Sequence, residues 1–157
     1  MEDKFSLFIE SVPEEHQQNI LELHKLFTKY ECHCDIKEAK SGYVVSYINQ
    51  HNKKTLANIV FRKTGIKLRM YLEHIASYDS YLDELPSSMK QEVRKAGICK
   101  RLYDPTTCNQ RCSMGYRFTM DHEEYKLCRN MAFMPTIQKE TQPYIIKLLK
   151  LELEYRN

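Results

Sequence analysis

Four of the six cysteines of this 157-residue chain lie in one segment, and cysteine thiolates are common ligands of zinc and iron. They are Cys99, Cys108, Cys112 and Cys128. Zinc in structural sites usually takes four ligands, and the number of cysteines fits that requirement. The spacing C-x8-C-x3-C-x15-C lacks the close pairs of typical zinc motifs. We predict a structural zinc site here, with iron as the alternative metal and His122 as a substitute ligand.

The same cysteines are open to two alternative roles. Cys108 and Cys112 are candidates for a reversible thiol pair, which would make the protein a thiol-dependent redox protein. Alternatively, all of the thiols are ordinary reduced side chains in a protein-interaction domain without metal. In a strand, Cys32 and Cys34 would share one face and His33 would point to the other, so these three favour separate structural roles.

A basic block in the middle of the chain is the second chemical feature. Residues 39–72 carry seven lysines and arginines and no acidic residue. On predicted strands, five residues would form a sheet face that stacks tyrosine rings between cations, a combination that suits an anionic ligand or nucleic acid. These residues are Tyr43, Tyr47, Lys67, Arg69 and Tyr71. The competing interpretation places the two earlier tyrosines beneath the C-terminal helix.

Motifs of the common nucleotide-dependent and serine-dependent enzymes are absent. The chain contains no phosphate-binding G-x-x-x-x-G-K-[ST], no G-x-G-x-x-G and no G-x-S-x-G, and only four glycines in all. No catalytic residue is predicted, and a binding function is favoured over an enzymatic one.

The elements that would position these residues follow from hydrophobic periodicity. A short helix is expected over 4–10, and a longer one opens at the capping-box pattern of Ser11 and Glu14 and ends near Tyr30. From Cys32 the period changes to two, and strands are predicted over 42–50, 55–63 and 66–73 as an antiparallel meander.

Helices and a hairpin are expected in the second half of the chain. Helical segments over 74–85 and 87–97 follow the meander, and a loop then carries the first cysteines. A hairpin is predicted around Asp121-His122-Glu123, and a final amphipathic helix opens at Thr141.

These patterns predict one α+β domain over residues 1–157. Its antiparallel sheet, a meander plus a C-terminal hairpin, would be packed by N-terminal, middle and C-terminal helices. Residues 1–97 would form a helix-sheet-helix core, and 98–157 the cysteine segment, hairpin and last helix. No stretch approaches the roughly 20 apolar residues of a membrane span. The start of the chain shows no secretory signal, so we expect no membrane partner and a cytoplasmic location.

Two stretches of the first 97 residues carry a family resemblance. "FRKTGIKLRMYL" (61–72) and "YDSYLDELPSSM" (78–89), in the order helices, antiparallel strands, helices, resemble small uncharacterised bacterial domains of the YdhG-like superfamily. The resemblance covers roughly residues 1–97, with the cysteine-containing part as an extension. It implies a curved antiparallel sheet against helices, and iron binding as proposed for some relatives, but it assigns no catalytic residue.

Overall fold

The computed structural model describes residues 3–40, 42–108 and 111–155, and it has the predicted α+β fold. The helical elements are α1 (Lys4–Ser11), α2 (Glu14–Lys29), α3 (Ile75–Tyr78), the 3-10 helix η1 (Asp79–Glu84), α4 (Ser87–Lys95), α5 (Lys100–Tyr103) and α6 (Gln142–Leu153). The strands are β1 (Cys32–Ala39), β2 (Gly42–Asn49), β3 (Thr55–Arg62), β4 (Gly65–Met70), β5 (Tyr116–Met120) and β6 (Glu123–Leu127).

The central sheet is an antiparallel meander of four strands in the order β1-β2-β3-β4. The alternating pattern predicted the last three of these strands, and β1 adds a fourth. The backbone of residues 133–137 continues this sheet beyond β4. The Leu68 amide donates to the Pro135 carbonyl at 3.1 Å, and the Met70 amide donates to the Phe133 carbonyl at 2.8 Å. This segment therefore satisfies an edge that β4 would otherwise expose.

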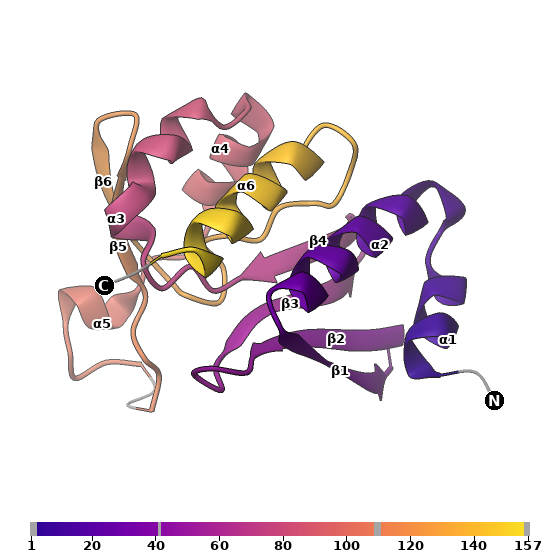
Figure 1. Ribbon diagram of the computed structural model, residues 1–157. Helices are drawn as coiled ribbons and strands as arrows, with labels where there is room; N and C mark the ends of the chain where they lie inside the picture. The colour runs from indigo at the N-terminus through magenta and orange to yellow at the C-terminus, as the bar shows by residue number, and fades with distance from the viewer. Residues whose placement is uncertain (1–2, 41, 109–110, 156–157) are drawn as a thin grey trace.

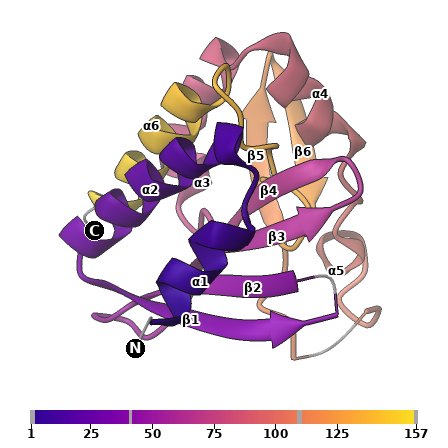
Figure 2. The same cartoon turned by 90° about the vertical axis from the view of Figure 1, so that its right-hand side faces the viewer.

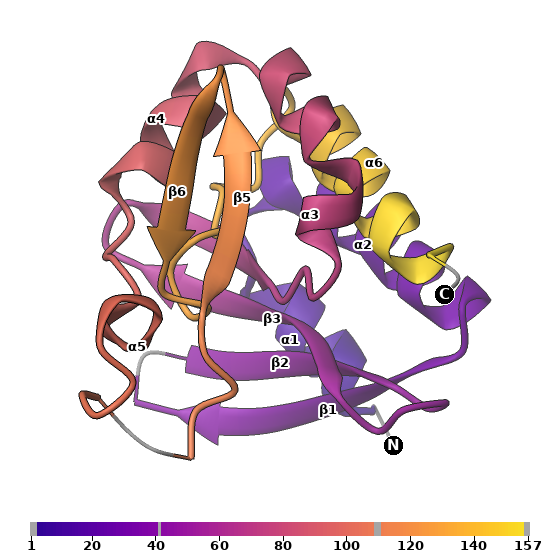
Figure 3. The same cartoon turned by 90° about the vertical axis from the view of Figure 1, so that its left-hand side faces the viewer.

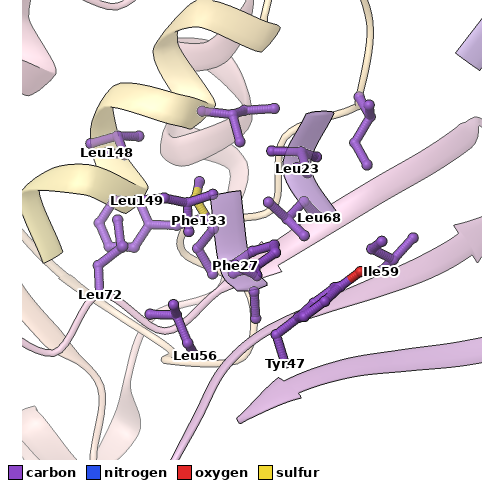
Figure 4. Close-up of a cluster of buried hydrophobic side chains, with 14 of the residues drawn as sticks. Leu23, Phe27, Tyr47, Leu56, Ile59, Leu68, Leu72, Phe133, Leu148 and Leu149 are labelled. Carbon is purple, nitrogen blue, oxygen red and sulfur yellow. The ribbon is translucent and has the colours of Figure 1, made fainter. Parts of the chain in front are cut away.

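One face of the sheet is covered by helices from both ends of the chain. α1 and α2 lie across it, and α6 lies beside α2 (Figures 1 and 2). Leu23 and Phe27 of α2 meet Leu148 and Leu149 of α6 in a cluster that also contains Phe133 (Figure 4). Burial of such large apolar side chains stabilises a fold by about 1.5–3 kcal/mol each. The C-terminal helix is therefore part of the same core as the N-terminal helices.

The predicted hairpin is confirmed and consists of β5 and β6. Its two-residue turn, Asp121 and His122, has φ of 49° and 68°, the left-handed backbone that a tight hairpin turn requires. The hairpin stands beside α3, η1 and α4 (Figure 3). The Asp121 amide donates to Asp83 of η1 at 2.7 Å, and Lys90 of α4 lies 3.0 Å from the Asp121 carboxylate. The turn is thus tied to two neighbouring helical elements.

Some local predictions are wrong. Ser11 does not cap α2, because its hydroxyl donates to the Phe8 carbonyl at 2.6 Å and ends α1 instead. The side-chain cap belongs to α1, where Asp3 accepts the Ser6 amide at 2.8 Å. Part of the predicted cysteine loop forms α5. In the ranges that the structure describes, no helix combines the length and the apolar composition needed to cross a bilayer.

Candidate functional site

The structure corrects the predicted zinc site. All six cysteines are free thiols, and within the described part of the chain no group of three His, Cys, Asp or Glu side chains is placed to hold a metal ion. Cys99 is buried, and its Sγ accepts the Gly115 amide at 3.1 Å. Cys108 is exposed, whereas Cys112 and Cys128 are half-buried. The four thiols match zinc in number only, so the zinc-site prediction is wrong. Cys108 and Cys112 are free thiols, and their role as a redox pair stays a prediction.

The other predicted ligands are also separated. His122 lies exposed at the turn of the hairpin, whereas Cys128 follows the opposite end of β6. Cys32 and Cys34 lie on the inner face of β1, with His33 exposed on the other face, as predicted for a strand. Burial raises the pKa of Cys32 to about 11, so this residue stays a thiol at neutral pH.

The predicted tyrosine-bearing basic face is divided between the two sides of the sheet. Tyr47 is fully buried on the inner face, and its ring stacks on Phe27 of α2 with centroids 4.0 Å apart. Tyr43 shares this face and meets the Phe8 ring of α1 edge-on. Helices therefore cover both tyrosines, but the competing interpretation named the wrong helix: α1 and α2 cover them, not the C-terminal helix.

The remaining three residues of that predicted face lie on the outer side of the sheet and are already engaged. Lys67 Nζ is 3.6 Å from Glu92 Oε2. Arg69 Nε donates to the Asn130 carbonyl at 2.8 Å, and the Tyr71 hydroxyl donates to Asn130 Oδ1 at 3.0 Å. Arg69 and Tyr71 thus bind the segment around Asn130 to the sheet. The five residues of the predicted basic face therefore do not form one surface.

A histidine–carboxylate pair at the end of β4 is the arrangement best suited to chemistry. His74 follows β4 and precedes α3, and Glu152 lies in the last turn of α6, beside α3 (Figure 1). Glu152 Oε1 accepts the His74 amide at 3.0 Å and the Tyr78 hydroxyl at 2.6 Å, and Glu152 Oε2 lies 2.7 Å from His74 Nδ1. Three donors therefore converge on one carboxylate, whose side chain is 8% exposed.

This geometry fixes which imidazole nitrogen carries the proton. An ionised carboxylate only accepts hydrogen bonds, so His74 Nδ1 is the donor to Glu152. The neutral ring then has its lone pair on Nε2, the nitrogen that acts as proton acceptor in enzymes with the same pairing. The His74 side chain is 39% exposed, and its ring stacks on Tyr155 with centroids 4.0 Å apart. The ring is thus oriented from two sides and remains accessible.

His74 lines a cavity of about 370 Å³ that adjoins a second cavity of about 410 Å³. The two share four lining residues, Lys54, Thr55, Tyr71 and Glu73, and we call the combined space the polar cleft. Asn49, His51 and Asn52, from the end of β2 and the β2–β3 turn, line the first cavity; Ser46, Asn58 and Asn130 line the second. Both volumes lie within the range of small-molecule sites.

An arginine between two tyrosine rings forms one wall of the polar cleft. Arg129 Cζ lies 5.2 Å from the centroid of Tyr71 and 5.7 Å from that of Tyr116, distances at which cation–π attraction operates. Its guanidinium also donates to Glu73 and, at 3.3 Å, to the Met114 carbonyl. These contacts hold the guanidinium in place at the cleft.

Burial keeps the phenols of Tyr78 and Tyr116 protonated. It is the largest cause of the raised pKa of Tyr78, followed by the neighbouring Glu152 carboxylate. Burial and then the charge of Glu73 raise the pKa of Tyr116, and Arg129 opposes this. The Tyr116 hydroxyl is buried and has no hydrogen-bond partner among the described residues. Because its phenol stays protonated, Tyr78 serves as a hydrogen-bond donor that helps to fix Glu152.

The His74–Glu152 pair was not predicted from the sequence, although one signal was present. His74 stands immediately after a strand whose alternation is the clearest in the chain, a position at which functional side chains are often found. Its partner Glu152 is 78 residues away, on α6, a helix that the sequence predicted only from its apolar residues.

The comparisons with known proteins give no match. No protein-family model, curated protein or solved structure is significantly similar to the chain, and the resemblance to the YdhG-like superfamily stays a prediction.

Proposed function

We propose that the protein is an enzyme that hydrolyses a small polar substrate in the polar cleft, with His74 as the general base. The observation that carries the proposal is the His74–Glu152 pair, with Nδ1 bound to a nearly buried carboxylate and Nε2 left as the acceptor. This pairing orients the ring and stabilises the imidazolium that forms when Nε2 takes a proton.

Water is the nucleophile in this proposal. Ser46 and Ser113 line only the second cavity of the polar cleft. The cavity that His74 lines has no serine or cysteine among the described residues, which disfavours a covalent intermediate on either side chain there. His74 Nε2 takes a proton from a water molecule, and the water oxygen attacks the carbonyl carbon of an ester. The bond to the leaving alcohol then breaks, and the imidazolium returns the proton to that alcohol.

Lys54 is the cation best placed to stabilise negative charge on the substrate, whether that charge develops during the attack or is carried by the substrate from the start. It lines both cavities and has no ion pair among the residues that the structure describes. Arg129, by contrast, is already paired with Glu73. A small acid-bearing molecule is favoured over a nucleic-acid strand, because Arg69 and Tyr71 on the outer face are bound to Asn130.

The test is the hydrolysis of p-nitrophenyl acetate, an activated ester whose leaving group needs no protonation. We expect His74→Gln and Glu152→Gln to lower the rate by about 100-fold, the usual contribution of a general base. His51→Gln is the matched control, since His51 lines the same cavity but pairs with Glu31 at 3.2 Å on the surface. A wild-type rate no higher than that of free imidazole, or equal losses in the control, would refute the proposal.

We also propose a cytoplasmic location. The support is that all six cysteines are free thiols, the state that a reducing compartment maintains.

A further inference from the structure

A third, open cavity lies apart from the His74–Glu152 pair and is lined by residues of the β3–β4 turn, the end of α4 and the segment 131–134. Its volume is about 520 Å³. Ala96, Met131 and Met134 provide its apolar floor. We call it the methionine pocket. Methionine side chains are flexible and polarisable, and they suit surfaces that accept apolar groups of differing shape.

Cations surround this floor. Arg62, Lys63, Lys67 and Lys95 line the methionine pocket, against the single carboxylate of Glu92. That carboxylate lies 3.6 Å from Lys67 Nζ and also accepts the Thr136 hydroxyl at 3.5 Å. No carboxylate of the described residues comes within ion-pair distance of the other three cations, which are exposed. The rim therefore has a net positive charge that the protein itself does not neutralise.

Met131 is the exposed part of this floor. It is 47% exposed, whereas Ala96 and Met134 are half-buried. An apolar floor within a ring of cations is complementary to a molecule that has an apolar part and an acidic group.

We propose that the methionine pocket binds a small amphipathic anion, such as a medium-chain carboxylate. The chain lies on Met131, Met134 and Ala96, and the acidic group is held by Arg62, Lys63 and Lys95. This site is separate from the proposed hydrolytic function, and the inference does not depend on it.

The test uses 8-anilinonaphthalene-1-sulfonate, an amphipathic anion whose fluorescence rises in apolar surroundings. The chain has no tryptophan to interfere. We expect octanoate to displace the probe. Octanol lacks the charge and acetate lacks the chain, so each should compete about tenfold less well than octanoate. A tenfold difference corresponds to a contribution of about 1.4 kcal/mol from the contacts of the missing part. Affinity should also fall as the salt concentration rises.

Variants separate specific binding from adventitious binding of the probe. The double variant Lys63→Glu/Lys95→Glu and the single variant Met131→Gln change exposed side chains and should each weaken octanoate binding by about tenfold or more. Lys25→Glu, an exposed charge reversal on α2, is the control and should leave affinity unchanged. Unchanged melting temperatures verify that each variant is folded. Equal affinity in all four proteins, or octanol competing as well as octanoate, would overturn the proposal.

Discussion

Gly115 is the residue at which the packing of the cysteine segment is tightest. A Cβ atom at this position would lie 2.0 Å from the Leu127 carbonyl oxygen and 2.7 Å from Cys99 Cβ. Neither neighbour is the end of a flexible side chain, so the backbone itself would have to move. The same close approach lets the Gly115 amide donate to Cys99 Sγ. The segment is thus organised by packing at Cys99, and not by the metal that the cysteine count predicted.

We therefore expect Gly115→Ala to lower the free energy of unfolding by about 2 kcal/mol, the usual cost of forcing extra volume into a packed site. Urea denaturation followed by circular dichroism measures this loss. Gly97→Ala is the matched control, because a Cβ there meets the flexible Met131 Cε at 2.6 Å, and this exposed side chain can turn away. Equal losses in the two variants would show that the close approach at Gly115 has no special importance.

At the scale of elements, hydrophobic periodicity predicted which segments form helices and strands. It did not predict which face of the sheet the helices cover. β2 alternates Tyr43, Val45 and Tyr47 with residues that include Val44 and Ile48, so both of its faces carry apolar side chains. Alternation alone does not say which of them is buried. The α+β class and the hairpin turn were predictable because their signals are local.

The candidate site depends on contacts between distant elements. His74 is the N-cap residue of α3, and Glu152 lies in the last turn of α6. The position of that turn is set by α6 packing beside α2, through residues such as Leu148 and Leu149. A single sequence does not state which polar residue of one helix meets a given residue of another, so the pair became visible only in the structure.

Docking of α1 and α2 on the sheet gives the protein a predictable pH dependence. His24 of α2 lies between the Phe5 ring, stacked at 3.8 Å, and the Tyr47 hydroxyl, 2.8 Å from its Nδ1. Burial lowers the pKa of His24 below its ordinary value of 6.5, and the charge of Asp3 opposes this only partly. The unfolded chain therefore binds a proton at this residue more readily than the folded protein does.

We expect the stability contributed by neutral His24 to be complete above about pH 6.5 and to be lost as the pH falls below that value. His24→Gln cannot titrate, so its free energy of unfolding should fall less steeply than that of the wild type between about pH 7 and 5. Urea denaturation of both proteins across this range measures the two slopes. Identical slopes would mean that His24 is not the group responsible.

At the scale of the whole molecule, the part of the chain after residue 97 completes the core that the first part begins. Residues 1–97 contain all four strands of the central sheet, which is why the sequence suggested a core within them. Yet the amides of Leu68 and Met70 donate to carbonyls of the segment 133–137. Phe133, together with two leucines of α6, also fills the space between that sheet and α2 (Figure 4).

A fragment of residues 1–97 should therefore fail to fold alone. Losing even one large core side chain usually costs about 2–5 kcal/mol, and a whole domain is stable by only about 5–15 kcal/mol, so the loss of three is comparable to the entire stability of a domain. The fragment would also have a bare β4 edge, which favours aggregation.

Amide proton dispersion in NMR spectra and thermal melting followed by circular dichroism provide the measurement, with the full chain as the reference. Adding a separately produced fragment of residues 98–157 should restore both dispersion and a cooperative melt, because the missing edge and core residues return together. If residues 1–97 alone melt cooperatively with dispersed amides, the first part of the chain is an independent domain, and the position of Glu152 beside His74 would then depend on an interface between two units rather than on one shared core.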